Sequence, residues 1–296
     1  MTAEGQPIEV EAPPPARTVL VPRHALSTRI THWINVVAFL LLLGSGLTIF
    51  NAHPHLYWGD ASRFSKPWLE MVAKPDAKGQ LRGQTRVGPF VFDTTGFLGA
   101  SKSVYGQMQS RGFPKWMTVP ARKSLSDGRR WHFFFAWVLV LNGLAYLVFG
   151  FLNRHIPRDL KVTRADLKTI PHEIATHARF QFPKGEEARR YNVLQKITYL
   201  KVIFLAFPVL ILAGWAMSPG LNALVDLPAL FGGRQSARSI HFIFAWGLVA
   251  FLLVHLVMVV ASGTWNNIRS MITGRDRKST RLNSSHTDIS RMPSSA

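Results

Sequence analysis

The sequence predicts an all-α membrane protein in which four transmembrane helices form a bundle and a long extracytoplasmic loop joins the first two helices. Hydrophobic residues make up 47% of the 296 residues and charged residues only 17%, whereas soluble domains carry roughly 25% charged residues. About 20 apolar residues suffice to cross a bilayer as a helix. Four runs of this length contain no Asp, Glu, Lys or Arg, at 30–59, 131–153, 202–225 and 239–268. A soluble single-domain enzyme is therefore excluded.

The tail 1–22 is rich in proline, and we expect it to be disordered. The first apolar run lacks a small-residue cleavage site, so it is expected to remain a helix rather than be removed as a signal peptide. Within one domain, 23–275, the helices are expected at 30–50, 131–152, 199–217 and 239–261. The tail 276–296 contains the string KSTRLNSSHTDISRMPSSA, which looks like translated sequencing-adaptor DNA. We expect this tail to be foreign to the native protein.

The distribution of charge predicts the orientation in the membrane. The net charge of +19 comes from basic residues that lie between the apolar runs, where anionic headgroups and topology account for them, so membrane lipid rather than nucleic acid is the expected partner. The connection 153–198 holds ten basic residues, whereas 218–238 holds two. Because Lys and Arg mark cytoplasmic loops, both termini are predicted to be cytoplasmic and the loop 51–130 to lie outside.

Four histidines carry the functional signal. The chain has no cysteine, which excludes disulfides, iron–sulfur ligation and thiolate nucleophiles. Ionisable side chains at membrane depth indicate a functional site by default. Histidines within or at the edge of the predicted helices are His32, His132, His241 and His255.

The spacing and the direction of the helices sort these histidines into pairs. His241 and His255 are fourteen residues apart, which places them on one helix face and about 21 Å apart along the axis. Depth then pairs His32 with His255 near the cytoplasmic side, and His132 with His241 near the outer side. Two facing histidines suit a six-coordinate haem iron, and such ligation favours electron transfer because no position is open for substrate. The sequence therefore predicts two haems and no catalytic residue.

These residues resemble the bacterial b-type cytochrome family of membrane anchor subunits. This cytochrome b561-like family includes the gamma subunit of respiratory formate dehydrogenase, the cytochrome b of nickel–iron hydrogenase and the thiosulfate reductase cytochrome b subunit. The resemblance implies two haem b groups, with the four histidines as iron ligands, in the bacterial inner membrane. The motifs that carry it are Arg29-x-x-His32-Trp33, Ser45-Gly46, the His241/His255 pair and Tyr191-Asn192-x-x-Gln195-Lys196.

The resemblance also implies a quinone site beside the cytoplasmic haem. In the formate dehydrogenase branch, that site uses the Asn of the last motif and a haem-ligating His, which correspond to Asn192 and His255 here. That branch has Gly where this chain has Leu194, so the backbone contact at this position differs. The alternative role of Asn192 is to cap the helix that follows it.

The implied function is that of an electron-transfer subunit rather than a stand-alone enzyme. It would pass electrons between a periplasmic redox partner and the membrane quinone pool of a respiratory chain. The length of the loop 51–130 is similar to that of a subgroup that docks an exported molybdopterin oxidoreductase. Two alternatives stay open: a self-contained cytochrome b561-like quinol oxidase, and a transporter whose histidines relay protons or bind a metal.

The loop itself contains two further features. His53 and His55 have no third ligand nearby in the sequence, so an interfacial turn is favoured over a metal site. The loop is also rich in aromatic residues, which are expected either to bury the loop or to form a docking surface for a partner. These aromatic residues are Trp58, Trp68, Phe90, Phe92 and Trp116.

Overall fold

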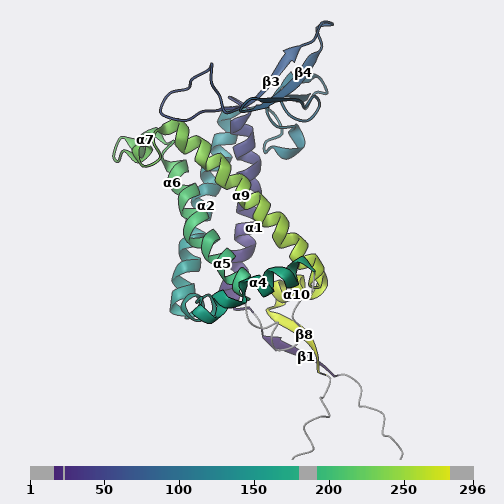
Figure 1. Ribbon diagram of the computed structural model, residues 1–296, viewed down its shortest axis with the longest axis vertical. Coiled ribbons are helices and arrows are strands. Elements are labelled where there is room, and N and C mark those ends of the chain that lie inside the picture. The colour runs from purple at the N-terminus through teal and green to yellow at the C-terminus, as the bar shows by residue number, and fades with distance from the viewer. Residues whose placement is uncertain (1–16, 23, 180–191, 281–296) are drawn as a thin grey trace, which may run out of the picture.

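A computed structural model describes residues 17–22, 24–179 and 192–280 of the chain (Figure 1). Four helical segments in this part of the chain are long and apolar enough to cross a membrane. They are α1 (Leu26–Phe50), α2 (Leu125–Leu152), the third segment Val193–Trp215 and α9 (Arg234–Ala261). The four segments run side by side as a bundle (Figure 1).

Each of these segments begins four to six residues before the predicted start. The predictions began near the first charge-free residue, but helices begin where the first backbone N–H groups find a partner. Ser124 accepts a hydrogen bond from Asp127 N at the start of α2. Asn192 caps the third segment in the same way. Charged residues such as Arg29, Asp127, Lys196 and Arg234 then lie in the first turns of the four segments.

The third segment contains a break in its helical hydrogen bonding. It consists of α5 (Val193–Lys201), the π-helical turn η3 (Val202–Ala206) and α6 (Phe207–Trp215). Pro208 has no N–H to donate to the carbonyl four residues before it. In η3 the N–H of Phe207 bonds Val202 O, five residues back, which is the widened turn that such a break allows.

A β-structure lies between α1 and α2 and corrects the all-α prediction. Its four-stranded antiparallel sheet has the order β2-β3-β4-β5, and β6 and β7 form a separate hairpin. The bounds are β2 (His55–Leu56), β3 (Leu69–Pro75), β4 (Leu81–Val87), β5 (Phe90–Asp93), β6 (Ala100–Lys102) and β7 (Met108–Ser110). The chain is therefore mostly helical with a small β-unit at one end of the bundle, which we call the sheet end (Figure 1).

The sheet is attached to the bundle by a shared hydrophobic core. Leu47 and Phe50 at the end of α1 are buried together with residues of the sheet and the loop that follows it. Phe113 packs on Phe50 with ring centroids 5.5 Å apart, and Phe242 of α9 stacks on Phe50 at 5.0 Å. The remaining members of this core are Leu56, Leu69 and Met71. The β-unit is thus continuous with the bundle rather than a detached loop.

The opposite end of the bundle, which we call the tail end, carries the remaining long helices (Figure 1). The elements at the tail end are α3 (His155–Asp159), α4 (Arg164–Ala178) and α10 (Thr264–Thr273). The short helices at the sheet end are η1 (Lys115–Met117), α7 (Pro219–Asn222) and α8 (Leu227–Leu230). The strand β1 (Arg17–Pro22) pairs with β8 (Arg275–Thr280). Residues 17–22 therefore differ from the expected disordered tail. We assign no function to this pairing because 276–280 belong to the tail expected to be foreign.

Candidate functional site

The structure brings the four histidines together in two pairs, one near each end of the bundle. At the sheet end, His132 of α2 faces His241 of α9, with ring centroids 6.1 Å apart and ring planes at 64°. At the tail end, His32 of α1 faces His255 of α9 at 6.4 Å and 49°. We call these the sheet-end pair and the tail-end pair. One helix, α9, contributes a member to both pairs.

The separation within each pair fits two imidazoles on one metal ion. A metal–imidazole bond is about 2 Å long, and the centre of the ring lies roughly 1.1 Å beyond the bonded nitrogen. Two imidazoles on opposite sides of one ion therefore have centroids about 6.3 Å apart. The measured separations of 6.1 and 6.4 Å agree with this value. The residues present thus fit a bis-histidine haem at each level.

Hydrogen bonds orient both rings of the sheet-end pair. His132 Nδ1 lies 3.1 Å from Leu42 O and 3.2 Å from Ser45 Oγ. His241 Nδ1 lies 2.8 Å from Leu210 O. A carbonyl oxygen only accepts hydrogen bonds, so Nδ1 carries the proton in both rings, which leaves the Nε2 lone pair available to a metal.

The tail-end pair is oriented by packing instead. His32 meets the edge of Trp33, with ring centroids 5.5 Å apart, and His255 stacks on Phe251 at 6.0 Å. His32 Nδ1 is buried and has no hydrogen-bond partner among the described residues. A buried polar atom without a partner costs free energy, so this nitrogen fits a position completed by a bound group. The two pairs therefore differ in how their rings are held.

Two glycines make room for the sheet-end rings. A Cβ atom on Gly46 of α1 would lie 3.3 Å from His132 Cε1, and one on Gly214 of α6 would lie 3.2 Å from His241 Cε1. Both separations are tighter than ordinary van der Waals contact. Gly46 was part of a motif recognised in the sequence, whereas Gly214 was not identified, because nothing local to it signals a histidine 27 residues away.

The structure shows Asn192 in its alternative role as a helix cap. Its side chain accepts a hydrogen bond from Gln195 N at 2.8 Å, and Gln195 Oε1 accepts one from Asn192 N at 3.4 Å. This reciprocal arrangement is a capping box. Tyr191, which precedes Asn192 in the recognised motif, lies outside the described residues.

Polar contacts tie the segment before β3 to the first turns of α9, just before the sheet-end histidine of that helix. Arg238 Nη2 donates to His53 O at 2.6 Å, and Ser239 Oγ donates to Tyr57 O at 2.6 Å. Trp68 Nε1 in turn donates to Ser239 Oγ at 2.9 Å. These contacts are not predictable from the sequence, because they join residues more than 170 positions apart.

His53 and His55 form a ring stack rather than a histidine pair on a shared ion. Their centroids are 4.8 Å apart, and both stack on Tyr57. His55 Nε2 lies 3.2 Å from Glu70 Oε1. Burial lowers the pKa of His53, and the nearby charges of Arg238 and His55 lower it further. No group of three or more His, Cys, Asp or Glu side chains is placed to hold a metal ion within the part of the chain that the structure describes.

Comparisons with known proteins agree with this geometry. Residues 23–274 match the family model of prokaryotic cytochrome b561. The chain is also similar to the putative protein-methionine-sulfoxide reductase subunit YedZ1 of Azospira oryzae, with 27% identity over 236 residues, which cover 78% of this chain and 86% of that protein. No solved structure matches the chain. The chain belongs to the prokaryotic cytochrome b561 family, and is a multi-pass b-type cytochrome of a bacterial membrane that transfers electrons.

Proposed function

We propose that the chain holds two haem b groups, one at each histidine pair, and passes electrons across the membrane between an extracytoplasmic redox partner and membrane quinone. The observation that carries this proposal is the presence of two opposed histidine pairs on a single helix, at 6.1 and 6.4 Å. The fourteen residues between His241 and His255 separate the two levels by about 21 Å. Each level lies within one leaflet of a bilayer core about 30 Å thick.

The residues around the pairs would serve electron transfer rather than catalysis at the metal. Haem iron supplies a one-electron couple between its ferric and ferrous forms. His132 with His241, and His32 with His255, would hold the iron from two sides, which would leave no position open for substrate or O₂. The carbonyl oxygens of Leu42 and Leu210 hold the sheet-end rings in one orientation, and hydrogen bonds of this kind raise the basicity of the ligand. A fixed ligand geometry keeps the structural change on reduction small.

The name of the relative from Azospira oryzae describes a reductase subunit, which supports a separate redox partner over a self-contained quinol oxidase. We propose an oxidoreductase of the molybdopterin type as this partner, in a respiratory chain of the bacterial inner membrane. Reduced-minus-oxidised absorbance spectra of the purified chain test the haem proposal directly. Sharp b-type bands with a haem content of two per polypeptide are expected, and one haem per polypeptide would contradict the proposal.

We expect the sheet end to face outward and both termini to be cytoplasmic. Ten basic residues in 153–198 against two in 218–238 support this orientation. The chain has no cysteine, so a single introduced cysteine is the only thiol that a labelling reagent can modify. Ala77→Cys in the turn after β3 should react with an impermeant thiol reagent in intact spheroplasts, and Ala175→Cys in α4 should react only after lysis. The reverse pattern would invert the topology and exchange the depths of the two pairs.

We also propose that quinone exchanges electrons at the tail end, near His255, with Asn192 as a hydrogen-bond donor to a quinone carbonyl. Asn192→Ala should slow electron exchange between haem and quinol about tenfold to a hundredfold, because a hydrogen bond to a charged group is worth about 1.5–3 kcal/mol. The rate is measured by stopped-flow reduction of the haems with a quinol analogue.

A second variant separates the proposed quinone contact from the cap. Asn192→Ser keeps a good capping oxygen but removes the amide donor. A slow exchange in both variants supports the quinone contact. A normal rate in Asn192→Ser would show that Asn192 acts only as the cap of α5.

A further inference from the structure

The segment before β3 is locked onto the sheet-end terminus of α9. We call residues 58–68 the crossover loop, because the chain here crosses over the start of that helix (Figure 1). Gly59 O accepts hydrogen bonds from Gln235 N at 2.9 Å and Ser236 N at 3.1 Å, and Gly59 N donates to Ser236 Oγ at 2.8 Å. These contacts satisfy N–H groups that a helix start leaves unpaired. The loop thus completes the helix that carries His241.

The loop approaches the start of α9 closely at Gly233. Gly233 precedes α9 with φ at +114°, and a Cβ atom there would lie 2.5 Å from Gly59 C and 2.6 Å from Asp60 N. Arg234 N also donates to Asp60 Oδ1 at 3.2 Å. The backbone of the crossover loop at Gly59 and Asp60 is therefore anchored to the start of α9, the helix that also carries His241.

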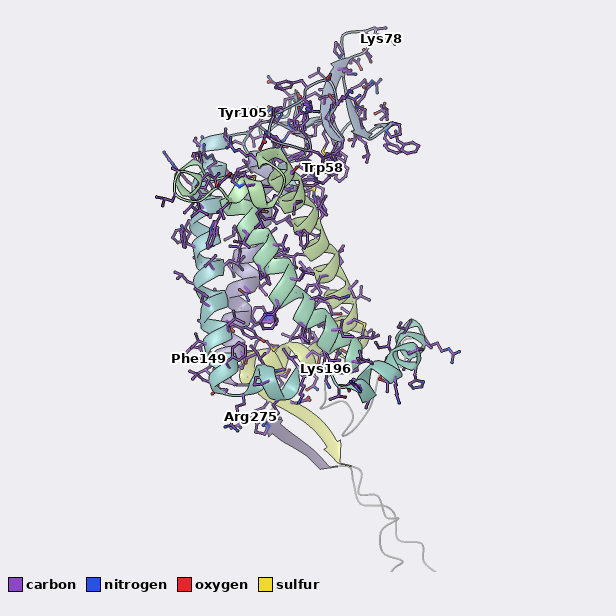
Figure 2. All side chains as sticks on the ribbon, turned by 60° about the vertical axis from the view of Figure 1, so that its left-hand side comes forward. Trp58, Lys78, Tyr105, Phe149, Lys196 and Arg275 are labelled. Atoms are coloured by element: carbon purple, nitrogen blue, oxygen red, sulfur yellow. The ribbon has the colours of Figure 1, made fainter. Side chains whose placement is uncertain are left out.

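A chain of contacts leads from the surface of this loop to a haem ligand. Trp58 is 51% exposed and lies near the sheet-end terminus of α9 (Figure 2). Its ring stacks on Trp68, with centroids 5.9 Å apart and planes at 21°. Trp68 Nε1 donates to Ser239 Oγ at 2.9 Å. Ser239 is fully buried and precedes His241 by two residues, so ring contact, hydrogen bond and backbone link the surface to the sheet-end pair.

The exposed side chains of the loop combine aromatic rings with positive charge. Phe64 is 72% exposed, and Arg63 and Lys66 are exposed beside it. Trp and Arg are among the residues that most often dominate binding energy at protein interfaces. The whole segment 51–124 holds eleven Lys and Arg residues and four Asp and Glu residues. Complementary charge steers association, while like charges oppose it, so an acidic protein fits this surface and a second copy of the chain does not.

We propose that the crossover loop is the docking surface of an acidic extracytoplasmic redox protein, and that electrons enter or leave the sheet-end pair there. This inference rests on the proposed function. In one direction, a haem held by His132 and His241 would supply one electron, which would reduce a one-electron acceptor on the docked protein. In the other direction the same electron moves back. No covalent bond forms or breaks.

Charge reversal with charged oxidants tests the electron-exchange part of the proposal. Ferricyanide is a trianion and hexaammineruthenium(III) a trication, and each takes one electron from the reduced chain. At about 0.1 M ionic strength screening acts over roughly 10 Å, so only nearby charges matter. The double variant Arg63→Glu/Lys66→Glu should slow oxidation by ferricyanide about tenfold and accelerate oxidation by hexaammineruthenium(III), since local charge changes on-rates by ten- to a thousandfold.

The matched control carries the same change in net charge at the far tip of the β3–β4 hairpin. Lys74 and Lys78 are exposed, and Lys78 lies at the tip remote from the bundle (Figure 2). Lys74→Glu/Lys78→Glu should change both rates less than about twofold under the same screening. Equal effects of the two double variants would show that only net charge matters and would overturn the proposal.

A second experiment tests docking by thiol modification, which does not depend on electron transfer from haem. Ser65→Cys places a thiol within the crossover loop, and Ala77→Cys places one between Lys74 and Lys78. Polyglutamate, as a stand-in for an acidic partner, should protect the thiol at 65 from N-ethylmaleimide several-fold more than the thiol at 77. Arg63→Glu/Lys66→Glu should abolish that protection. Equal protection at both sites would overturn the docking surface.

Further outcomes separate this inference from the proposed function. A thiol at position 65 that reacts in detergent but not in proteoliposomes would show that lipid covers the loop, and would also overturn the proposal. Both haem bands and the rate of reduction by quinol should be unchanged in the charge variants. If the chain without substitutions shows no haem bands, the proposed function is contradicted instead. The thiol-protection experiment would still decide whether the crossover loop is a docking surface.

Discussion

Replacing a single histidine of a pair should remove one haem of the two and leave the other. His132→Ala or His241→Ala should abolish the sheet-end haem, and His32→Ala or His255→Ala should abolish the tail-end haem, because each variant lacks one of the two histidines that would hold that haem. A native-state ligand stabilises the fold that binds it, so the variants should also accumulate to a lower level. The measurement is haem per polypeptide in the protein that accumulates, together with its reduced-minus-oxidised spectrum.

This experiment decides which two histidines belong to the same haem. His132→Ala and His241→Ala should lose the same spectral component, since their rings are 6.1 Å apart. His53→Ala serves as the control, because His53 lies at the sheet end but stacks on His55 and Tyr57. It should retain both haems. Loss of the same component in His32→Ala and His241→Ala would contradict the assigned pairs.

Arg111→Met should open the β-unit at the sheet end. The Arg111 side chain is fully buried and donates to Phe113 O at 2.8 Å, Thr118 Oγ1 at 3.0 Å and Ala121 O at 3.1 Å. Phe113 O still accepts a hydrogen bond from Asn51 Nδ2 at 3.1 Å, so the two acceptors that lose their donor are Thr118 Oγ1 and Ala121 O. At about 1–3 kcal/mol for each acceptor, a total loss of about 2–6 kcal/mol would raise the population of the opened segment roughly thirtyfold or more.

Chymotrypsin digestion measures this opening, because cleavage follows the population of the open form when reclosing is fast. Arg122→Met is the matched control. It removes the same charge from an exposed ion pair with Asp127, and such pairs contribute about 0–1 kcal/mol. Cleavage within 51–124 should accelerate only in the Arg111 variant. Equal rates in the two variants would show that the buried guanidinium does not hold the β-unit together.

Features that depend on local spacing were predictable from the sequence. Apolar length alone indicated four membrane-spanning segments, because the bilayer core sets a minimum helix length. The pairing of His241 with His132 and of His255 with His32 was predicted from the fixed rise and rotation per helical residue, combined with the direction of each helix. No knowledge of side-chain packing was needed for this placement. What the histidines bind remains a proposal, supported by the family to which the chain belongs.

The β-unit was not predictable in the same way. Its strands are two to seven residues long, and their register is fixed by pairing between separated segments, such as His55 with Glu70. The alternation of apolar Leu69, Met71 and Ala73 with charged Glu70 and Lys74 was a weak signal that could have indicated β3. Short strands gain stability mainly from neighbours and a shared core, and here part of that core is Phe50 of α1.

The sequence by itself determined the number of spans, which histidines share a level of the bundle and the basic character of the segment 51–124. Only the tertiary structure decided which atoms orient the imidazole rings of the sheet-end pair. It also decided through which contacts the exposed crossover loop reaches that pair. The Leu42 carbonyl meets a ring 90 residues away, and Ser239 meets Trp68 from 171 residues away. The level of a histidine and the charge of a segment depend on residues that are close together in the sequence. A hydrogen bond, in contrast, requires two groups within about 3 Å of each other in space. Chain folding alone brings such distant groups to that distance.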